Sequence, residues 1–248
     1  MESRPITLSG MTVLITGAAR RLGRIMALSA AQAGADIILH HIHSPQEAEE
    51  TAETIRGFGR NAWVLKADLS NSDETKRLCD FAFSLAPISG LINNAAIFKP
   101  LDLTSTTLED WNQHIQINLT APFLLSQNFA ARFDGSPPGR IINILDWRAI
   151  RPGKDHFPYT VSKSALAAMT KSFALSLAPG ILVNAIALGA ILPPENEPYD
   201  QNIIKKVPMQ RWANLDELGS LITYLLNGPT YITGEIIHLD GGRHLIYT

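Results

Sequence analysis

The sequence predicts one α/β domain, with a parallel sheet of about seven strands and helices on both of its faces. Short runs rich in Ile, Leu and Val alternate with longer amphipathic stretches along the chain. Most of these runs are apolar on both faces, as in the strands of a parallel sheet that helices cover on each side. A length of 248 residues suits one such domain. Successive β-then-α units without a linker therefore indicate a single doubly wound, Rossmann-type domain over residues 1–248.

The elements follow one another at regular intervals. The expected strands cover residues 11–16, 36–41, 62–66, 90–93, 140–145, 181–186 and 235–239. Amphipathic periodicity between them predicts helices over residues 24–33, 45–58, 72–86, 108–133, 159–177 and 216–226. Gly34 is expected to end the first helix, because glycine readily adopts the left-handed backbone that closes many helices.

The segment 189–214 departs from this alternation. It is more than 20 residues long and contains Pro193, Pro194, Pro198 and Pro208. Connections of this length between packed elements usually have a function. In open α/β sheets, ligands bind beyond the carboxyl ends of the strands, and this segment follows a strand. We expect it to cover the substrate; the alternative is a disordered surface insertion.

Charge and composition exclude several function classes. The 21 Lys and Arg residues nearly balance the 23 Asp and Glu residues, so bulk electrostatics indicates neither nucleic acid nor an anionic membrane as a partner. Cys79 is the single cysteine, which excludes an intrachain disulfide and a cysteine-based metal cluster. No apolar run approaches the roughly 18–20 residues that span a bilayer, and the first ten residues lack a signal-peptide core. A cytoplasmic protein is therefore expected.

The stretch TGAARRLG, at residues 16–23, predicts a phosphate-binding turn between the first strand and the first helix. Gly17 can adopt backbone angles that a side chain forbids, and Gly23 lets the helix lie close to the strand. The first turn of the helix then offers free N–H groups to a pyrophosphate. Arg21 occupies a position where a glycine would leave the edge of the pyrophosphate site open. Its side chain can therefore reach both a phosphate and the substrate. The alternative is that Arg21 is a solvent-exposed arginine.

The end of the second strand, LHHIHSP, favours NADP over NAD. An NAD-selective site usually has an acid here, but no acid occurs before Glu47. His41, His43 and Ser44 can donate hydrogen bonds to a 2′-phosphate, and Arg20 can add a charged fork. A metal site is the alternative for the histidines. Strand alternation sends His40 to the opposite face, and no further ligand is evident, so we expect no metal.

Tyr159 and Lys163 are four residues apart, on one side of a predicted helix. A free tyrosine has a pKa of about 10 and exchanges protons slowly at neutral pH. A nearby ammonium favours the phenolate and lowers that pKa toward the working range. The pair therefore suits proton exchange with an oxygen or nitrogen atom that receives a hydride.

With these residues the chain resembles the short-chain dehydrogenase/reductases along nearly its whole length. The matching motifs are the turn 16–23, Asp68 after the third strand, NNAA at residues 93–96, Asn118, the Tyr159/Lys163 pair and DGG at residues 240–242. The resemblance implies that Tyr159 protonates the substrate, while Lys163 binds the nicotinamide ribose and lowers the pKa of the phenol. It also implies that Asn118 bends its helix and holds a water in the proton relay. Otherwise Asn118 is a buried helix amide and Asp240 a turn residue.

The same resemblance assigns cofactor contacts. Asp68 would meet the adenine, and Asn93 and Ala95 would line the cofactor through the backbone. The full set of implied cofactor residues is Gly17, Arg20, Arg21, Leu22, Gly23, His41, His43, Ser44, Asp68, Leu69, Asn94, Ala95, Tyr159, Lys163, Gly189 and Ile191.

One departure narrows the resemblance. The family usually has serine about a dozen residues before the tyrosine, whereas IINILDWRA places Asp146 there. A second negative charge disfavours a phenolate, but it suits a substrate with a nitrogen-rich edge or a ring nitrogen that needs a proton. Asp146 could then accept a hydrogen bond from Tyr159 and relay a proton. The alternative is a strand-end cap.

With aspartate at position 146 and arginine in the glycine turn, the chain resembles one branch of the family, the pteridine reductases and dihydromonapterin reductases. LHHIHS and the tail TGEIIHLDGGRHL support that branch, and NNAAIF places Phe98 where it has an aromatic ring on the pterin face. Otherwise Phe98 is a core residue. The implied substrate residues are Arg21, Phe98, Asp146 and Tyr159. Leu188 replaces a usual proline, and Trp147 and the Pro193-Pro194 pair alter the pocket wall.

The leading hypothesis is an NADPH-dependent reductase that transfers a hydride to a pterin C=N bond. The first alternative is a short-chain reductase for a carbonyl or another small substrate, with Asp146 incidental. The second is a non-catalytic NADP-binding regulator, which the intact set of Tyr159, Lys163 and Asn118 argues against. The family resemblance also implies a homotetramer.

Overall fold

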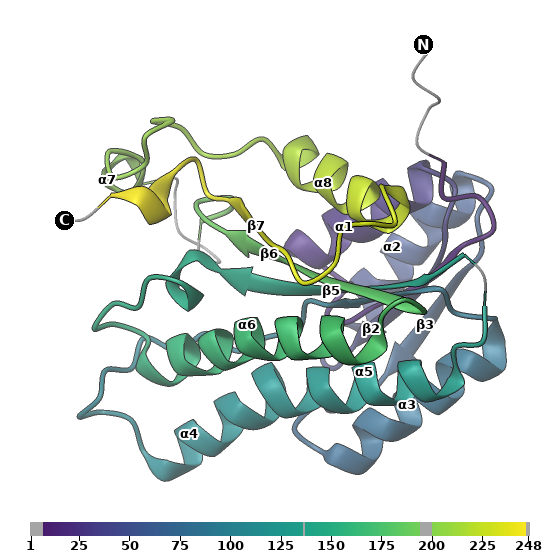
Figure 1. The fold of residues 1–248 in the computed structure, drawn as a ribbon, viewed down its shortest axis with the longest axis horizontal. Helices are drawn as coiled ribbons and strands as arrows, with labels where there is room; N and C mark the ends of the chain where they lie inside the picture. Colours follow the sequence, from purple (N-terminus) through teal and green to yellow (C-terminus); the bar gives the residue numbers. More distant parts are fainter. Residues whose placement is uncertain (1–6, 136, 194–199, 247–248) are drawn as a thin grey trace.

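The computed structural model describes residues 7–135, 137–193 and 200–246. Seven parallel strands form one sheet in the order β3-β2-β1-β4-β5-β6-β7, with helices on both faces (Figure 1). The predicted doubly wound fold is therefore confirmed. The strands are β1 Thr12–Ile15, β2 Asp36–His41, β3 Ala62–Lys66, β4 Gly90–Asn93, β5 Gly139–Asp146, β6 Ile181–Leu188 and β7 Ile236–Leu239.

Two helical layers enclose the sheet (Figure 1). One layer holds α1 Arg21–Gln32, α2 Pro45–Gly57 and α8 Leu215–Asn227. The other holds α3 Ser72–Leu85, α4 Leu108–Ile115, α5 Ala121–Arg132 and α6 Phe157–Leu177. Each layer buries its own apolar cluster against the sheet. Met26, Ile55 and Ile222 belong to the first cluster, and Leu78 and Phe129 belong to the second. The central strands are thus covered on both sides, which is why they are apolar throughout.

Some element ends differ from the prediction. Helix α1 begins at Arg21, three residues before the expected start, so Gly23 lies inside its first turn. Strand β5 runs one residue further than expected, to Asp146, and β6 runs two residues further, to Leu188. The helix predicted over residues 108–133 contains a π-helical turn, Gln116–Thr120, between α4 and α5. Periodicity alone missed this turn, because one extra residue leaves the apolar face nearly unchanged.

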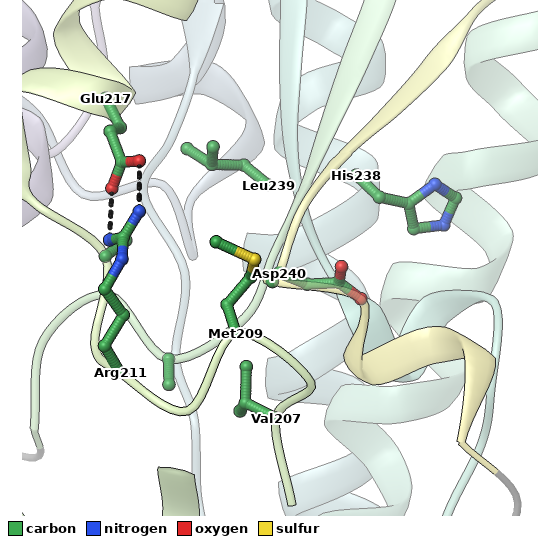
Figure 2. Close-up of a pocket in the computed structure, with 10 residues that line it drawn as sticks. Val207, Met209, Arg211, Glu217, His238, Leu239 and Asp240 are labelled. Carbon is green, nitrogen blue, oxygen red and sulfur yellow. Dashed lines mark hydrogen bonds and ion pairs between the residues drawn. The ribbon is translucent and has the colours of Figure 1, made fainter.

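The segment 189–214 lies at the carboxyl end of the sheet. Residues 194–199, with Pro194 and Pro198, lie outside the described residues; the rest includes a short helix, α7 Gln201–Ile204. A cavity of about 160 Å³ lies here, and both terminal nitrogens of Arg211 contact Glu217 at its edge, at 2.8 and 2.7 Å (Figure 2). His238 points away from that pair. The Ala213 N–H donates to the Ala190 carbonyl at 3.0 Å, so both ends of the segment are joined.

Asp240 fixes the turn after β7. Its carboxylate accepts hydrogen bonds from the Gly242 N–H at 2.9 Å and from the His244 N–H at 2.8 Å, and it is 4% exposed. A turn role therefore accounts for this residue. Among the described residues, no helix combines the length and apolarity that a bilayer crossing requires.

Candidate active site

A cavity of about 540 Å³ opens at the carboxyl ends of β1, β2, β3 and β4, where the strand order reverses. This is the place where open α/β sheets bind ligands. Most of the predicted cofactor residues line it: Gly17, Arg20, Arg21, Leu22, Gly23, His41, His43, Ser44, Asp68, Leu69, Asn94 and Ala95. The predicted cofactor residues outside its lining are Tyr159, Lys163, Gly189 and Ile191. Ile191 is a core residue, 2% exposed, and its cofactor contact stays a prediction.

The glycine turn has the close backbone approach that a pyrophosphate site needs. Gly17 has a φ of +63°, and a Cβ on Gly23 would lie 1.9 Å from the Gly17 carbonyl oxygen. Asn94 Nδ2 donates to the carbonyls of Thr16 and Gly17 at 2.8 and 3.1 Å. Thr16 Oγ1 in turn accepts from the N–H of Asn94 and Ala95 at 2.9 and 3.0 Å. The turn and the NNAA stretch are therefore held as one unit, and its backbone fits a dinucleotide phosphate.

His40 fixes this unit from the neighbouring strand. Its Nδ1 accepts the Gly17 N–H at 3.1 Å, and its Nε2 lies 3.0 Å from the Ala67 carbonyl. These two contacts require a neutral ring with the proton on Nε2. Burial lowers the pKa of His40 to about 4, which keeps the ring neutral. Sequence reasoning missed this role, because it depends on Gly17 and Ala67 meeting at one strand end.

The end of β2 supplies donors to the same cavity. His41 is 6% exposed, and its Nδ1 has no hydrogen-bond partner within the described part of the chain. Burial and then the nearby Lys66 lower the pKa of His41. His43 and Arg20 are exposed at the cavity rim. This set suits a phosphate and includes no acid from the strand. Among the described residues, no group of His, Cys, Asp or Glu is arranged to hold a metal ion.

Asp68 lies at the end of β3 on the far wall of the cavity. Its Oδ1 accepts the Ser70 N–H at 2.8 Å, and its own N–H donates to Glu74 Oε2 at 2.7 Å. Both contacts fix the loop that carries Asp68, and its contact with the adenine stays a prediction.

Asp146 ends β5, next to β4 in the sheet, and Tyr159 of α6 lies close to it. Tyr159 is 8% exposed, and Asp146 is partly buried. Burial and the Asp146 carboxylate raise the pKa of Tyr159 well above its ordinary value. Burial also raises the pKa of Asp146, against the opposing effects of Arg148 and Lys163. Asp146 Oδ1 accepts the Arg148 N–H at 2.8 Å, so this residue both caps the strand end and faces the phenol.

Lys163 does not lower the pKa of Tyr159 in the way we expected. Its Nζ donates to the Ile144 carbonyl at 2.7 Å and lies 5.8 Å from the centroid of the Tyr159 ring. Arg148 is the cation that acts to lower the pKa of the phenol, and burial and Asp146 outweigh it. Burial lowers the pKa of Lys163 itself to about 8. Tyr159 is therefore a protonated phenol at neutral pH.

Asn118 lies in the π-helical turn and is completely buried. Its Oδ1 accepts the Ile97 N–H at 2.9 Å, and its Nδ2 donates to the Ile97 carbonyl at 3.0 Å and to Ser162 Oγ at 3.1 Å. These bonds join the loop after β4 to α6. The side chain thus positions the Tyr159 helix, and the water in the relay stays a prediction.

Arg21 lines the cavity at the ends of β1 to β4, and Phe98 lies against Tyr159. Phe98 is 48% exposed, so it is not a core residue. Its ring stacks on His156 at 3.9 Å and meets the Tyr159 ring edge-on at 4.6 Å. Arg21 has a φ of +54°, and its Nη2 donates to the Pro193 carbonyl at 2.5 Å. The phosphate turn therefore contacts the segment 189–214 directly. His156 and Arg148 are further site residues that sequence reasoning missed, although Arg148 follows Asp146 by two positions.

The chain is similar in sequence and structure to several known proteins. A protein-family profile described as enoyl-(acyl carrier protein) reductase matches residues 17–244. The 3-oxoacyl-[acyl-carrier-protein] reductase of Synechocystis is 30% identical over 240 residues, which cover 95% of this chain and 97% of that protein. The crystal structure of FolM alternative dihydrofolate reductase 1 from Brucella canis, complexed with NADP, is 34% identical with a TM-score of 0.90, covering 98% of this chain and 97% of that chain. A blue fluorescent protein from a metagenomic library, in complex with NADPH, is 29% identical with a TM-score of 0.89, covering 96% and 99%.

Proposed function

The chain belongs to the short-chain dehydrogenase/reductase family, and we propose that this oxidoreductase uses NADPH to reduce a dihydropterin-type substrate. The observation that carries the proposal is the Asp146 carboxylate beside the buried Tyr159 phenol, with the exposed ring of Phe98 next to them. A carboxylate accepts hydrogen bonds from the amino and N–H groups of a pterin edge, whereas a simple carbonyl offers it no donor. An aromatic face suits a flat heterocycle, since stacking contributes on the order of 0.5–1.5 kcal/mol beyond burial.

The cavity at the carboxyl ends of β1 to β4 suits NADPH. When bound, NADPH supplies the hydride. The backbone of residues 16–23 would hold the pyrophosphate, with His40 fixing the Gly17 N–H. Arg20, His41, His43 and Ser44 would hold the 2′-phosphate, and the Brucella relative and the metagenomic relative that bind NADP and NADPH support this choice.

The chain's own residues manage the proton. Reduction of a C=N bond needs a hydride at carbon and a proton at nitrogen, and the phenol of Tyr159 supplies that proton. Its raised pKa keeps the proton in place until the nitrogen becomes basic. The phenolate left behind lies beside Asp146, so the positive charges of Arg148 and Lys163 limit the repulsion. Asp146 meanwhile orients the donor edge of the substrate.

A second candidate is a reductase for a 3-oxoacyl thioester or another carbonyl. The identity to the Synechocystis 3-oxoacyl-[acyl-carrier-protein] reductase favours it. The Asp146 carboxylate argues against this second candidate. Asp146 raises the pKa of the proton donor Tyr159, and a carbonyl substrate has no hydrogen-bond donor to offer the carboxylate in return.

The test is NADPH oxidation by the wild-type protein with dihydrobiopterin, dihydromonapterin, dihydrofolate and a panel of carbonyl compounds that includes a 3-oxoacyl thioester. We expect the best dihydropterin to exceed every carbonyl compound at least tenfold in kcat/KM. Efficient turnover of a carbonyl compound with inert pterins would overturn the proposal. NADPH binding seen by fluorescence, with no turnover of any substrate, would indicate a regulator.

A further inference from the structure

A second, strongly basic cavity lies beside the Asp146–Tyr159 pair. It measures about 250 Å³ and begins at Trp147, the residue after Asp146. Four basic side chains line it, against a single acid, Asp155: they are Arg148, Arg151, Lys206 and Arg243. The proposed reaction uses only Arg148 of these four.

The acids near this cavity are already paired with one of its cations. Arg148 contacts Asp155 at 3.0 Å and Asp146 at 3.5 Å. Arg148 Nε is nevertheless buried without a hydrogen-bond partner in the described ranges. Arg243 and Lys206 form no ion pair with an acid among residues 7–135, 137–193 and 200–246. Burial and the charge of Arg148 lower the pKa of Arg243, as expected when cations gather without enough anions.

Trp147 and the chain after β7 hold these cations in place. The guanidinium carbon of Arg243 lies 4.4 Å from the centroid of the Trp147 ring, and that of Arg148 lies 4.9 Å from it. Cation–π contacts at this range restrain a guanidinium without neutralising its charge. Arg151 Nη1 also donates to the Arg243 carbonyl at 3.5 Å. The cavity is therefore a built concentration of positive charge next to the reacting groups.

We propose that this cavity binds an anionic group, a carboxylate or a phosphate, on the distal part of the substrate. Arginine forks and a lysine are the side chains that recognise these groups best. The volume is below the roughly 300–1,000 Å³ of pockets that enclose a whole small ligand, so it fits a terminal group rather than a ring. The inference rests on the proposed function and deepens it: the preferred dihydropterin carries an acidic tail.

The test compares two dihydropterins in wild-type protein and in the double variant Lys206→Gln/Arg243→Gln. Dihydrofolate carries two tail carboxylates, and dihydrobiopterin carries a neutral side chain. We expect the ratio of kcat/KM for dihydrofolate to that for dihydrobiopterin to fall at least tenfold in the double variant. Lys205→Gln is the matched control: Lys205 precedes Lys206, bonds Asn202 and does not line the cavity, so this ratio should stay within twofold of wild type.

A second substrate pair separates failure of this inference from failure of the proposed function. If the wild type reduces only 3-oxoacyl thioesters, the pair becomes the phosphopantetheine thioester, with its phosphate, and the uncharged N-acetylcysteamine thioester. A tenfold fall in that ratio supports the anion site and overturns pterin reduction. For whichever substrate pair the wild type reduces, an unchanged kcat/KM ratio in a double variant that keeps wild-type thermal stability overturns the anion site. Wild-type protein that reduces neither pair overturns both.

Discussion

At the scale of single residues, burial decides the chemistry more than sequence spacing does. Lys163 stands four residues after Tyr159, yet burial and Asp146 raise the pKa of the phenol above its ordinary value. Identities and approximate positions of Tyr159, Lys163, Asp146 and Phe98 follow from the sequence. The direction of the pKa shift does not, since it depends on which groups exclude water around the phenol. His40 is hidden for a similar reason: its partners Gly17 and Ala67 are 23 and 27 residues away.

The buried His40 ring makes the protein sensitive to acid. Its pKa in the folded state is about 4, below the ordinary 6.5, so the unfolded chain takes up a proton first as the pH falls. The contribution of neutral His40 to the free energy of unfolding is fully present above pH 6.5. It falls by up to about 3 kcal/mol as the pH drops toward 4. Urea unfolding at a series of pH values should show this loss in wild-type protein and a smaller loss in His40→Asn. The exposed control His43→Asn should behave as wild type; equal slopes in all three proteins would contradict the role of His40.

Cofactor choice is a second prediction at this scale. Arg20→Ala combined with His43→Ala should raise the KM for NADPH at least tenfold more than the KM for NADH, because both side chains lie on the rim where the 2′-phosphate is expected. Steady-state kinetics with the two cofactors measures this. Equal changes in both KM values would remove the 2′-phosphate assignment.

At the scale of elements, the sequence predicts the order of strands and helices and most of their ends to within about two residues. The two main differences lie at the site. Helix α1 begins before Gly23, where glycine disfavours a helix locally but the packed turn requires one. The π-helical turn at Gln116–Thr120 is set by the bonds of Asn118 to Ile97 and Ser162, which no local pattern reveals.

Two helical glycines provide a matched test of the phosphate turn. A Cβ on Gly23 of α1 would lie 1.9 Å from the Gly17 carbonyl oxygen, whereas a Cβ on Gly57 of α2 meets nothing within 4 Å. Gly23→Ala should cost about 3 kcal/mol of unfolding free energy or more and weaken NADPH binding. Gly57→Ala should be neutral or stabilise by up to about 1 kcal/mol. Chemical denaturation and fluorescence titration measure both, and a tolerated Gly23→Ala would contradict the close packing.

At the scale of the whole molecule, one helical layer leaves large apolar side chains exposed. Leu108 on α4, Phe123 on α5 and Leu175 on α6 are 75%, 38% and 86% exposed. Tyr159 lies in α6, and Asn118 lies in the π-helical turn between α4 and α5. An interface on these helices would therefore hold the helices that carry the site residues in place. The family resemblance implies a homotetramer built on such helices.

Light scattering after size exclusion tests this assembly. We expect a mass of about 108 kDa, four times the 27.1 kDa of one chain. Phe123→Glu should shift the population to smaller species, because it places a charge in the proposed interface. A wild-type mass of 27.1 kDa would contradict the assembly.

The most direct test of the account is the substrate preference of Asp146→Ser compared with that of the wild type. We attribute pterin selectivity to the Asp146 carboxylate, which lies beside the Tyr159 phenol. The measured quantity is the ratio of kcat/KM for the best dihydropterin to that for the best carbonyl compound, with NADPH saturating. We predict a ratio above ten in wild-type protein and a fall of at least a hundredfold in Asp146→Ser. A ratio that this substitution leaves unchanged, in a protein of wild-type stability, would contradict the central claim.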